Sequence, residues 1–197
     1  MRAKRDVLFW LERFAYTLDE DHAPDEPAIK RFPSRKDRPD LYELAYLWWT
    51  TQKLGADKSR QMMVTWVLVL CNLWLASLHE GKLVFFQSKK EKDAIHLLDR
   101  AQIAFDRLPA FLRPEYQRKE AEMIFPRLNS KIWAIPQGGD HIRSYTASSI
   151  LSDEAAKQPE FAEAYAASIP SIGKQGKFSF VSTPRGLNYF YVLMKDK

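Results

Sequence analysis

The chain has 197 residues, a length that favours one domain with room for a small additional subdomain. Hydrophobic residues make up 46% of it and aromatic residues 13%, which suffices for a core and excludes an intrinsically disordered chain. The formal net charge of +5 permits an anionic partner without requiring one. The single cysteine, Cys71, excludes an internal disulfide and a cysteine zinc cluster and fits a reducing compartment.

Hydrophobic periodicity and turn residues predict helices and strands that alternate along the chain. In chain order we expect a helix at 7–18, an exposed connector at 19–40, a helix at 40–50, a short strand at 54–56, an apolar helix at 62–79, a strand at 82–87, a helix at 90–108, a hairpin of strands at 122–125 and 131–135, a strand at 149–152, a helix at 161–169 and a strand at 177–181. This alternation predicts an α/β fold, with a mainly parallel central sheet and helices on both of its faces.

The apolar segment at 62–79 has two interpretations. It is almost long enough to approach a membrane span, but it contains Thr65, Asn72 and Ser77. A helix buried on all sides in an α/β core has the same composition. We favour the buried helix, because the segment follows a candidate phosphate-binding loop, and we therefore expect no membrane partner.

Polar side chains follow three of the predicted strands, at Lys58, at Asp153-Glu154 and at Ser182-Thr183. In parallel sheets the carboxyl ends of the strands meet at one edge, and ligands bind in the crevice beyond that edge. If the three strands are neighbours, these side chains converge on one site.

The loop after the first of these strands is a candidate phosphate-binding loop. The common phosphate loop reads Gly-x4-Gly-Lys-Ser/Thr before a helix, and Thr65 occupies the hydroxyl position here. Met63 and Val64 replace the second glycine and the lysine, while Lys58 at the start of the window has a stem that can reach phosphates. The candidate nucleotide-binding residues of this loop are Lys58, Ser59, Arg60, Gln61, Met62, Met63, Val64 and Thr65. The alternative is an ordinary basic turn that precedes a buried helix.

The acidic pair and the hydroxyl pair have matching interpretations. Nucleotide hydrolysis needs one carboxylate near Mg²⁺, a role that suits Asp153, and another that polarises water, which suits Glu154. Ser182 and Thr183 stand where hydroxyls can sense a γ-phosphate and pass on its loss. The alternatives are an acidic pair that favours a helix start and ordinary turn chemistry before a proline.

Four segments, taken in order, resemble the ATPase motifs of phage large terminase subunits, the motors that package double-stranded DNA into procapsids. They are KSRQMMVTW at 58–66, FFQSKK at 85–90, LSDEAA at 151–156 and STPRG at 182–186. The resemblance extends over roughly residues 41–191, most of the chain.

The resemblance implies a P-loop NTPase fold of the ASCE class, in which an extra strand lies between the phosphate-loop strand and the acidic strand. It implies that Thr65 and Asp153 hold Mg²⁺ and that Glu154 activates water. It also implies that Arg143, which precedes the acidic strand, reaches the nucleotide of a neighbouring subunit; a surface arginine on a glycine-rich loop is the alternative.

The resemblance further implies ATP and Mg²⁺ as ligands and double-stranded DNA, the portal protein, the small terminase subunit and further copies in a ring as partners. The place of action would be the host cell cytoplasm, at the procapsid portal during packaging. We expect an N-terminal helix and linker at 1–40 and the ATPase core at 41–197. The nuclease domain that follows the ATPase in such motors does not fit within this length.

Two other functions are compatible with the same motifs. A helicase-like ATPase could carry a similar acidic strand. A DNA- or portal-binding module with a degenerate nucleotide site would explain Met63 and Val64 in the loop.

Overall fold

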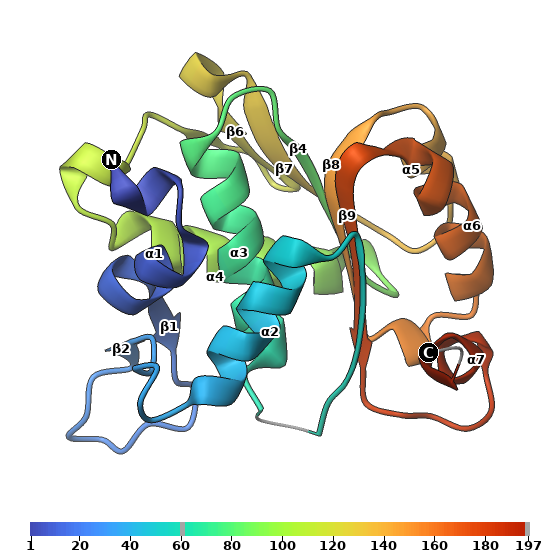
Figure 1. The fold of residues 1–197 in the computed structure, drawn as a ribbon, viewed down its shortest axis with the longest axis horizontal. Helices are drawn as coiled ribbons and strands as arrows, with labels where there is room; N and C mark the ends of the chain where they lie inside the picture. Colours follow the sequence, from blue (N-terminus) through green and yellow to red (C-terminus); the bar gives the residue numbers. More distant parts are fainter. Residues whose placement is uncertain (60–61, 196–197) are drawn as a thin grey trace.

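The computed structural model describes residues 1–59 and 62–195. Its helices are α1 (Val7–Phe14), α2 (Pro39–Thr50), α3 (Val64–Leu78), α4 (Glu91–Asp106), α5 (Asp140–Arg143), α6 (Phe161–Ser171) and α7 (Tyr189–Lys195). Its strands are β1 (Tyr16–Leu18), β2 (Ile29–Arg31), β3 (Lys53–Asp57), β4 (Leu83–Gln87), β5 (Gln117–Arg118), β6 (Glu122–Phe125), β7 (Ser130–Ile135), β8 (Ala147–Asp153) and β9 (Ile172–Ser182). These elements form an α/β fold (Figure 1).

Within the described residues, the central sheet has seven strands in the order β3-β9-β8-β4-β7-β6-β5. The strands from β3 to β7 in this order are parallel, whereas β6 and β5 are added antiparallel at one edge. Strand β9 lies between β3 and β8, so the extra strand expected between the loop strand and the acidic strand is present. The predicted fold class is confirmed.

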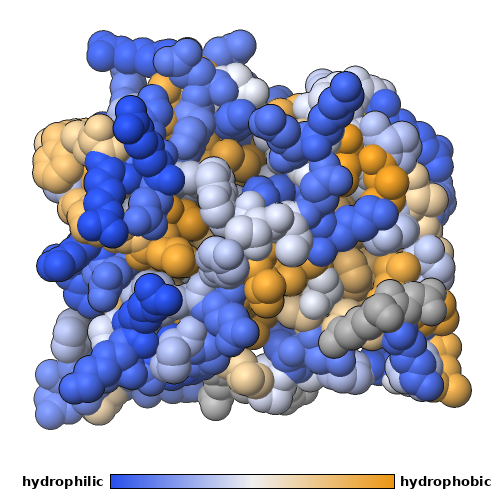
Figure 2. Space-filling view, in the orientation of Figure 1, coloured by the Kyte–Doolittle hydropathy of each residue, from blue (hydrophilic) through white to orange (hydrophobic). Residues whose placement is uncertain are grey.

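Helices cover both faces of this sheet. Figure 1 shows α1, α2, α3 and α4 on one side and α5, α6 and α7 on the other. Strand alternation divides the core accordingly, because neighbouring side chains point to opposite faces: Phe86 and Leu151 belong to the cluster under α1–α4, and Phe85 and Ile150 to the cluster under α5–α7. Figure 2 shows mostly hydrophilic side chains over the visible surface, with apolar patches between them.

The apolar segment forms α3, and every residue of this helix is buried. A helix without a polar face belongs in a core, and α3 packs against the sheet and against its neighbours α2 and α4. Across residues 1–59 and 62–195, no helix combines the length and hydropathy that crossing a bilayer requires.

The N-terminal elements differ from the prediction. The helix expected at 7–18 ends at Phe14, and Tyr16–Leu18 pairs antiparallel with Ile29–Arg31 inside the segment expected to be an exposed connector. Helical spacing extends past Phe14, but a tertiary pairing partner favours the extended form for a Tyr-Thr-Leu run. The apolar side chains at the start of the chain, Trp10 among them, lie in the same core cluster as α3.

The other differences are smaller. Strand β9 begins at Ile172, earlier than the predicted 177, and β5, α5 and α7 were not predicted. The hairpin at 122–125 and 131–135 is confirmed, and its turn places Asn129 at φ +48°. Asparagine tolerates this left-handed conformation better than most residues.

Candidate functional site

Three strand ends meet at one edge of the sheet, at the bottom of Figure 1. Asp57, the last residue of β3, pairs with Ser182 on β9, and Asp153 of β8 pairs with Val181 of the same strand. The backbone N–H of Lys58 donates to the carbonyl of Ser182 at 3.0 Å. Strands β3, β9 and β8 are therefore neighbours, which is the condition under which the sequence analysis expects their polar side chains to converge.

Lys58 contacts three polar side chains at this edge. Its Nζ lies 2.5 Å from the Thr65 hydroxyl and 2.9 Å from Asp153 Oδ1. The same Nζ lies 3.7 Å from Glu154 Oε1. The Lys58 and Asp153 side chains are only 14% and 12% exposed, so this ion pair is largely withdrawn from water.

Thr65 belongs to the first turn of α3, and its hydroxyl donates to Asp153 Oδ1 at 2.9 Å. This pairing joins the start of the buried helix to the end of β8. A threonine hydroxyl and a carboxylate are hard oxygen donors of the kind that Mg²⁺ prefers, and both already contact one cation, the Lys58 ammonium. The donor set therefore fits Mg²⁺.

Glu154 follows Asp153 with φ +52°, a left-handed conformation that is uncommon for a non-glycine residue. Its Oε2 accepts from Lys157 Nζ at 2.8 Å and from Ser182 Oγ at 3.4 Å. Burial by itself would raise the pKa of this carboxyl, but the hydrogen bond from Lys157 and the charges of Lys58 and Lys157, with the Ser182 bond, outweigh it. The net pKa is lower than usual, so Glu154 is ionised at neutral pH.

Gln158 stabilises the backbone of the acidic pair through hydrogen bonds. Its buried amide nitrogen donates to the Asp153 carbonyl at 2.7 Å and to Ser152 Oγ at 3.0 Å. This contact holds the backbone where β8 ends and Glu154 takes its left-handed conformation. The sequence analysis missed both Gln158 and Lys157, because each acts through one tertiary or turn contact and neither belongs to a recognisable pattern.

A cavity of about 630 Å³ opens beside this cluster. The loop residues that line it are Lys58, Ser59, Met62, Met63, Val64 and Thr65, and Glu154 and Thr183 join them. Thr17, Lys30 and Arg31 of the β1–β2 hairpin also line this cavity. The structure thus brings together most of the predicted site residues. The unpredicted β1–β2 hairpin, Trp66 of α3 and Arg100 of α4 also line the cavity.

Two predicted loop residues, Arg60 and Gln61, lie outside the described residues. Met63, which precedes α3, has φ +58°. This left-handed conformation favours glycine, and the common phosphate loop has glycine at this position. The chain thus keeps a glycine-like backbone there but adds a side chain at the cavity wall.

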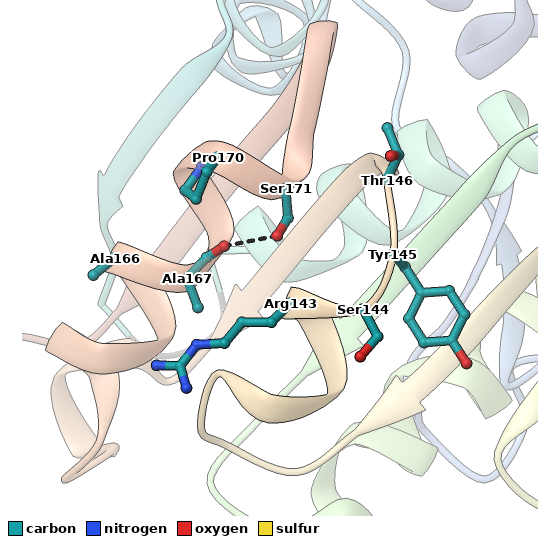
Figure 3. Close-up of a pocket in the computed structure, with 8 residues that line it drawn as sticks. All are labelled: Arg143, Ser144, Tyr145, Thr146, Ala166, Ala167, Pro170 and Ser171. Carbon is teal, nitrogen blue, oxygen red and sulfur yellow. Dashed lines mark hydrogen bonds between the residues drawn. The ribbon is translucent and has the colours of Figure 1, made fainter.

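Arg143 does not join the Lys58 cluster. It is 53% exposed and bonds Asp140 at 3.3 Å and Glu163 at 3.0 Å. It lines a separate cavity of about 520 Å³ between α5 and α6. Figure 3 shows its guanidinium group extended toward α6, away from Tyr145. Arg143 therefore does not contact a nucleotide that is bound at the Lys58 cluster of the same chain.

No protein-family profile matches the sequence. Among solved structures, the chain is similar to the HK97 bacteriophage large terminase, with a TM-score of 0.65, 14% identity, and coverage of 91% of this chain and 37% of that one. The ATPase domain of a Thermus phage large terminase matches with a TM-score of 0.60 and 19% identity, over 81% of this chain and 73% of that domain. The chain has the fold of a large terminase ATPase domain.

A third similar structure is the large terminase of the thermophilic bacteriophage D6E in complex with ADP. It has a TM-score of 0.53, 15% identity, and coverage of 73% of this chain and 38% of the other. The present chain thus spans well under half the length of the two whole terminases it resembles.

Proposed function

We propose that this chain is an ATP-hydrolysing domain of the phage large terminase type. One observation carries the proposal: in the fold of terminase ATPase domains, Lys58 contacts both Thr65 and Asp153 and faces Glu154 at a single strand-end edge. An ammonium, a hydroxyl and two carboxylates in one cluster are the groups that phosphoryl transfer to water requires.

The residues divide the work by their chemistry. Lys58 binds the terminal phosphates of ATP, because it lines the cavity and carries a compact charge on a flexible stem. Thr65 and Asp153 hold the metal, and bound Mg²⁺ neutralises charge on the triphosphate. Ser59, Met62 and Val64 line the phosphate side of the cavity, with Arg60 and Gln61 completing the loop in sequence.

Glu154 orients the attacking water. Its lowered pKa keeps it ionised, and Oε1 faces the Lys58 side of the site while Oε2 is held by Lys157. Ser182, which also touches Oε2, and the neighbouring Thr183 would pass loss of the γ-phosphate to the segment that follows β9. A residue that contacts both the water-orienting carboxylate and the chain beyond it suits such coupling.

In the assembled motor, we propose that hydrolysis drives double-stranded DNA into a procapsid. The fold supports this assignment, and the partners would be the portal protein, the small terminase subunit and further copies of the chain in a ring. The exposed Arg143 would then serve a neighbouring subunit's nucleotide. The place of action would be the portal, in the host cell cytoplasm.

The test begins with Glu154→Gln in the 197-residue chain. We expect the variant to bind Mg²⁺-ATP with wild-type affinity, measured by calorimetry, and to release phosphate at least about a hundredfold more slowly, the usual effect of losing a catalytic carboxylate. Glu115→Gln is the matched control, since Glu115 is an exposed carboxylate paired with Arg127.

Undiminished hydrolysis by Glu154→Gln would exclude the role given to Glu154. Absence of any ATP binding by the wild type would favour the alternative of a binding module with a degenerate nucleotide site.

A further inference from the structure

Lys58 is bonded to the same oxygen atoms that a divalent cation would use. Its Nζ lies 2.5 Å from Thr65 Oγ1 and 2.9 Å from Asp153 Oδ1. The two oxygens are themselves 2.9 Å apart. The nitrogen and the two oxygens therefore form a closed triangle in which every edge is a hydrogen bond.

The separation of the two oxygens matches octahedral metal geometry. Adjacent ligands of Mg²⁺, each at 2.0–2.1 Å and at right angles, lie about 2.9 Å apart. Thr65 Oγ1 and Asp153 Oδ1 have this separation. Glu154 Oε1 lies on the same side, 3.7 Å from the ammonium, so negative charge surrounds the position that the ammonium occupies.

We propose that the Lys58 ammonium is a built-in counter-ion for the metal site, and that a divalent cation and this ammonium exclude one another at the Thr65–Asp153 pair. The proposal rests on the proposed function and adds a second role to Lys58. The ammonium neutralises the largely buried Asp153, which would otherwise be an unpaired charge withdrawn from water. It moves to phosphate oxygens when a nucleotide brings them, and only then is the pair open to the metal.

The consequence is that metal binding depends on nucleotide. A divalent cation alone must displace an ammonium from Asp153 and remain a few ångströms from its positive charge. A metal–nucleotide complex carries its own anions, which give Lys58 a new partner. The lysine thus prevents the chain from binding free metal tightly and reserves the site for metal with ATP.

The experiment measures Mn²⁺ binding without nucleotide, because free Mn²⁺ is counted directly by electron paramagnetic resonance. We expect Lys58→Met to bind Mn²⁺ about tenfold or more tightly than the wild type. The substitution removes both the ammonium that competes for the Thr65–Asp153 pair and its repulsion of the metal. Adding Asp153→Asn to Lys58→Met should abolish the gain, which locates the metal.

Lys157→Met is the matched control. It also removes one positive charge beside Glu154, but its Nζ bonds Glu154 Oε2 rather than the Thr65–Asp153 pair. We expect a gain of about threefold or less, an indirect electrostatic effect. Equal gains in the two variants would show a general charge effect and overturn the proposal, as would an unchanged Mn²⁺ affinity in Lys58→Met.

Folding is checked by circular dichroism, and Lys58→Gln replaces Lys58→Met if the latter does not fold, because glutamine is neutral and can still donate to Asp153. Calorimetry with Mg²⁺-ATP on the wild type separates this inference from the proposed function. If the wild type binds ATP but the Lys58 variant shows no increase in Mn²⁺ affinity, only the inference is refuted. If the Lys58 variant binds Mn²⁺ more tightly but the wild type binds no ATP, the exclusion of the metal by the ammonium is supported and the ATPase assignment is refuted.

Discussion

Lys58 and Arg143 are the cations of two ion-pair clusters with opposite surroundings. Lys58 is 14% exposed and its partner Asp153 12%, and further polar groups complete the cluster. Arg143 is 53% exposed, and its partner Asp140 is 91% exposed. Charges withdrawn from water depend on each other strongly, whereas exposed pairs are screened and contribute little. Burial, and not the number of charges, therefore determines which cluster is sensitive to mutation.

The largest difference should appear on removal of the carboxylate. Asp153→Ala leaves the Lys58 ammonium without its closest anion, and we expect the free energy of unfolding to fall by roughly 3 kcal/mol. Asp140→Ala removes the matching carboxylate of the exposed cluster and should cost about 0.5 kcal/mol or less. Urea denaturation of both variants measures this contrast, and similar losses would contradict it.

A second test concerns backbone conformation beside the buried cluster. Met63 and Asn129 both have positive φ, at 58° and 48°, but only Met63 lines the cavity. Met63→Gly frees the backbone for close approach to phosphate, and we expect ATP to bind about fivefold more tightly, equivalent to about 1 kcal/mol. Asn129→Gly should leave ATP affinity unchanged in calorimetry. Higher ATP affinity in both variants would show that the effect does not depend on the position of Met63 at the cavity.

A third test uses the half-exposed member of the buried cluster. Lys157 lowers the pKa of Glu154, so the pair stabilises the fold above the ordinary carboxyl pKa and loses this contribution as the pH falls through the lowered one. We expect Lys157→Gln to be less stable than the wild type at pH 7 by about 0.5 kcal/mol. This difference in stability should vanish in strongly acidic solution. Lys157→Arg, which keeps the positive charge, should have the stability of the wild type. A difference that does not depend on pH would refute the charge explanation.

The smallest effect is expected at the exposed cation. Arg143→Ala removes two screened ion pairs, and the unfolding free energy should change by about 0.5 kcal/mol or less. ATP affinity of the isolated chain should also be unchanged, because Arg143 lies outside the cavity of the Lys58 cluster. A large loss of ATP affinity in the monomer would remove the contrast between the two clusters.

The sequence by itself determined the α/β layering and the buried character of α3, and it placed Lys58, Asp153 and Ser182 at the ends of predicted strands. These follow from local periodicity and from the rule that parallel strands end on the same side. Only the tertiary structure decided that Tyr16–Leu18 would pair with Ile29–Arg31 and line the cavity. Only it placed Gln158 behind Asp153 and separated Arg143 from Lys58. Such contacts depend on which surfaces meet in space, and no local pattern in the sequence records that choice.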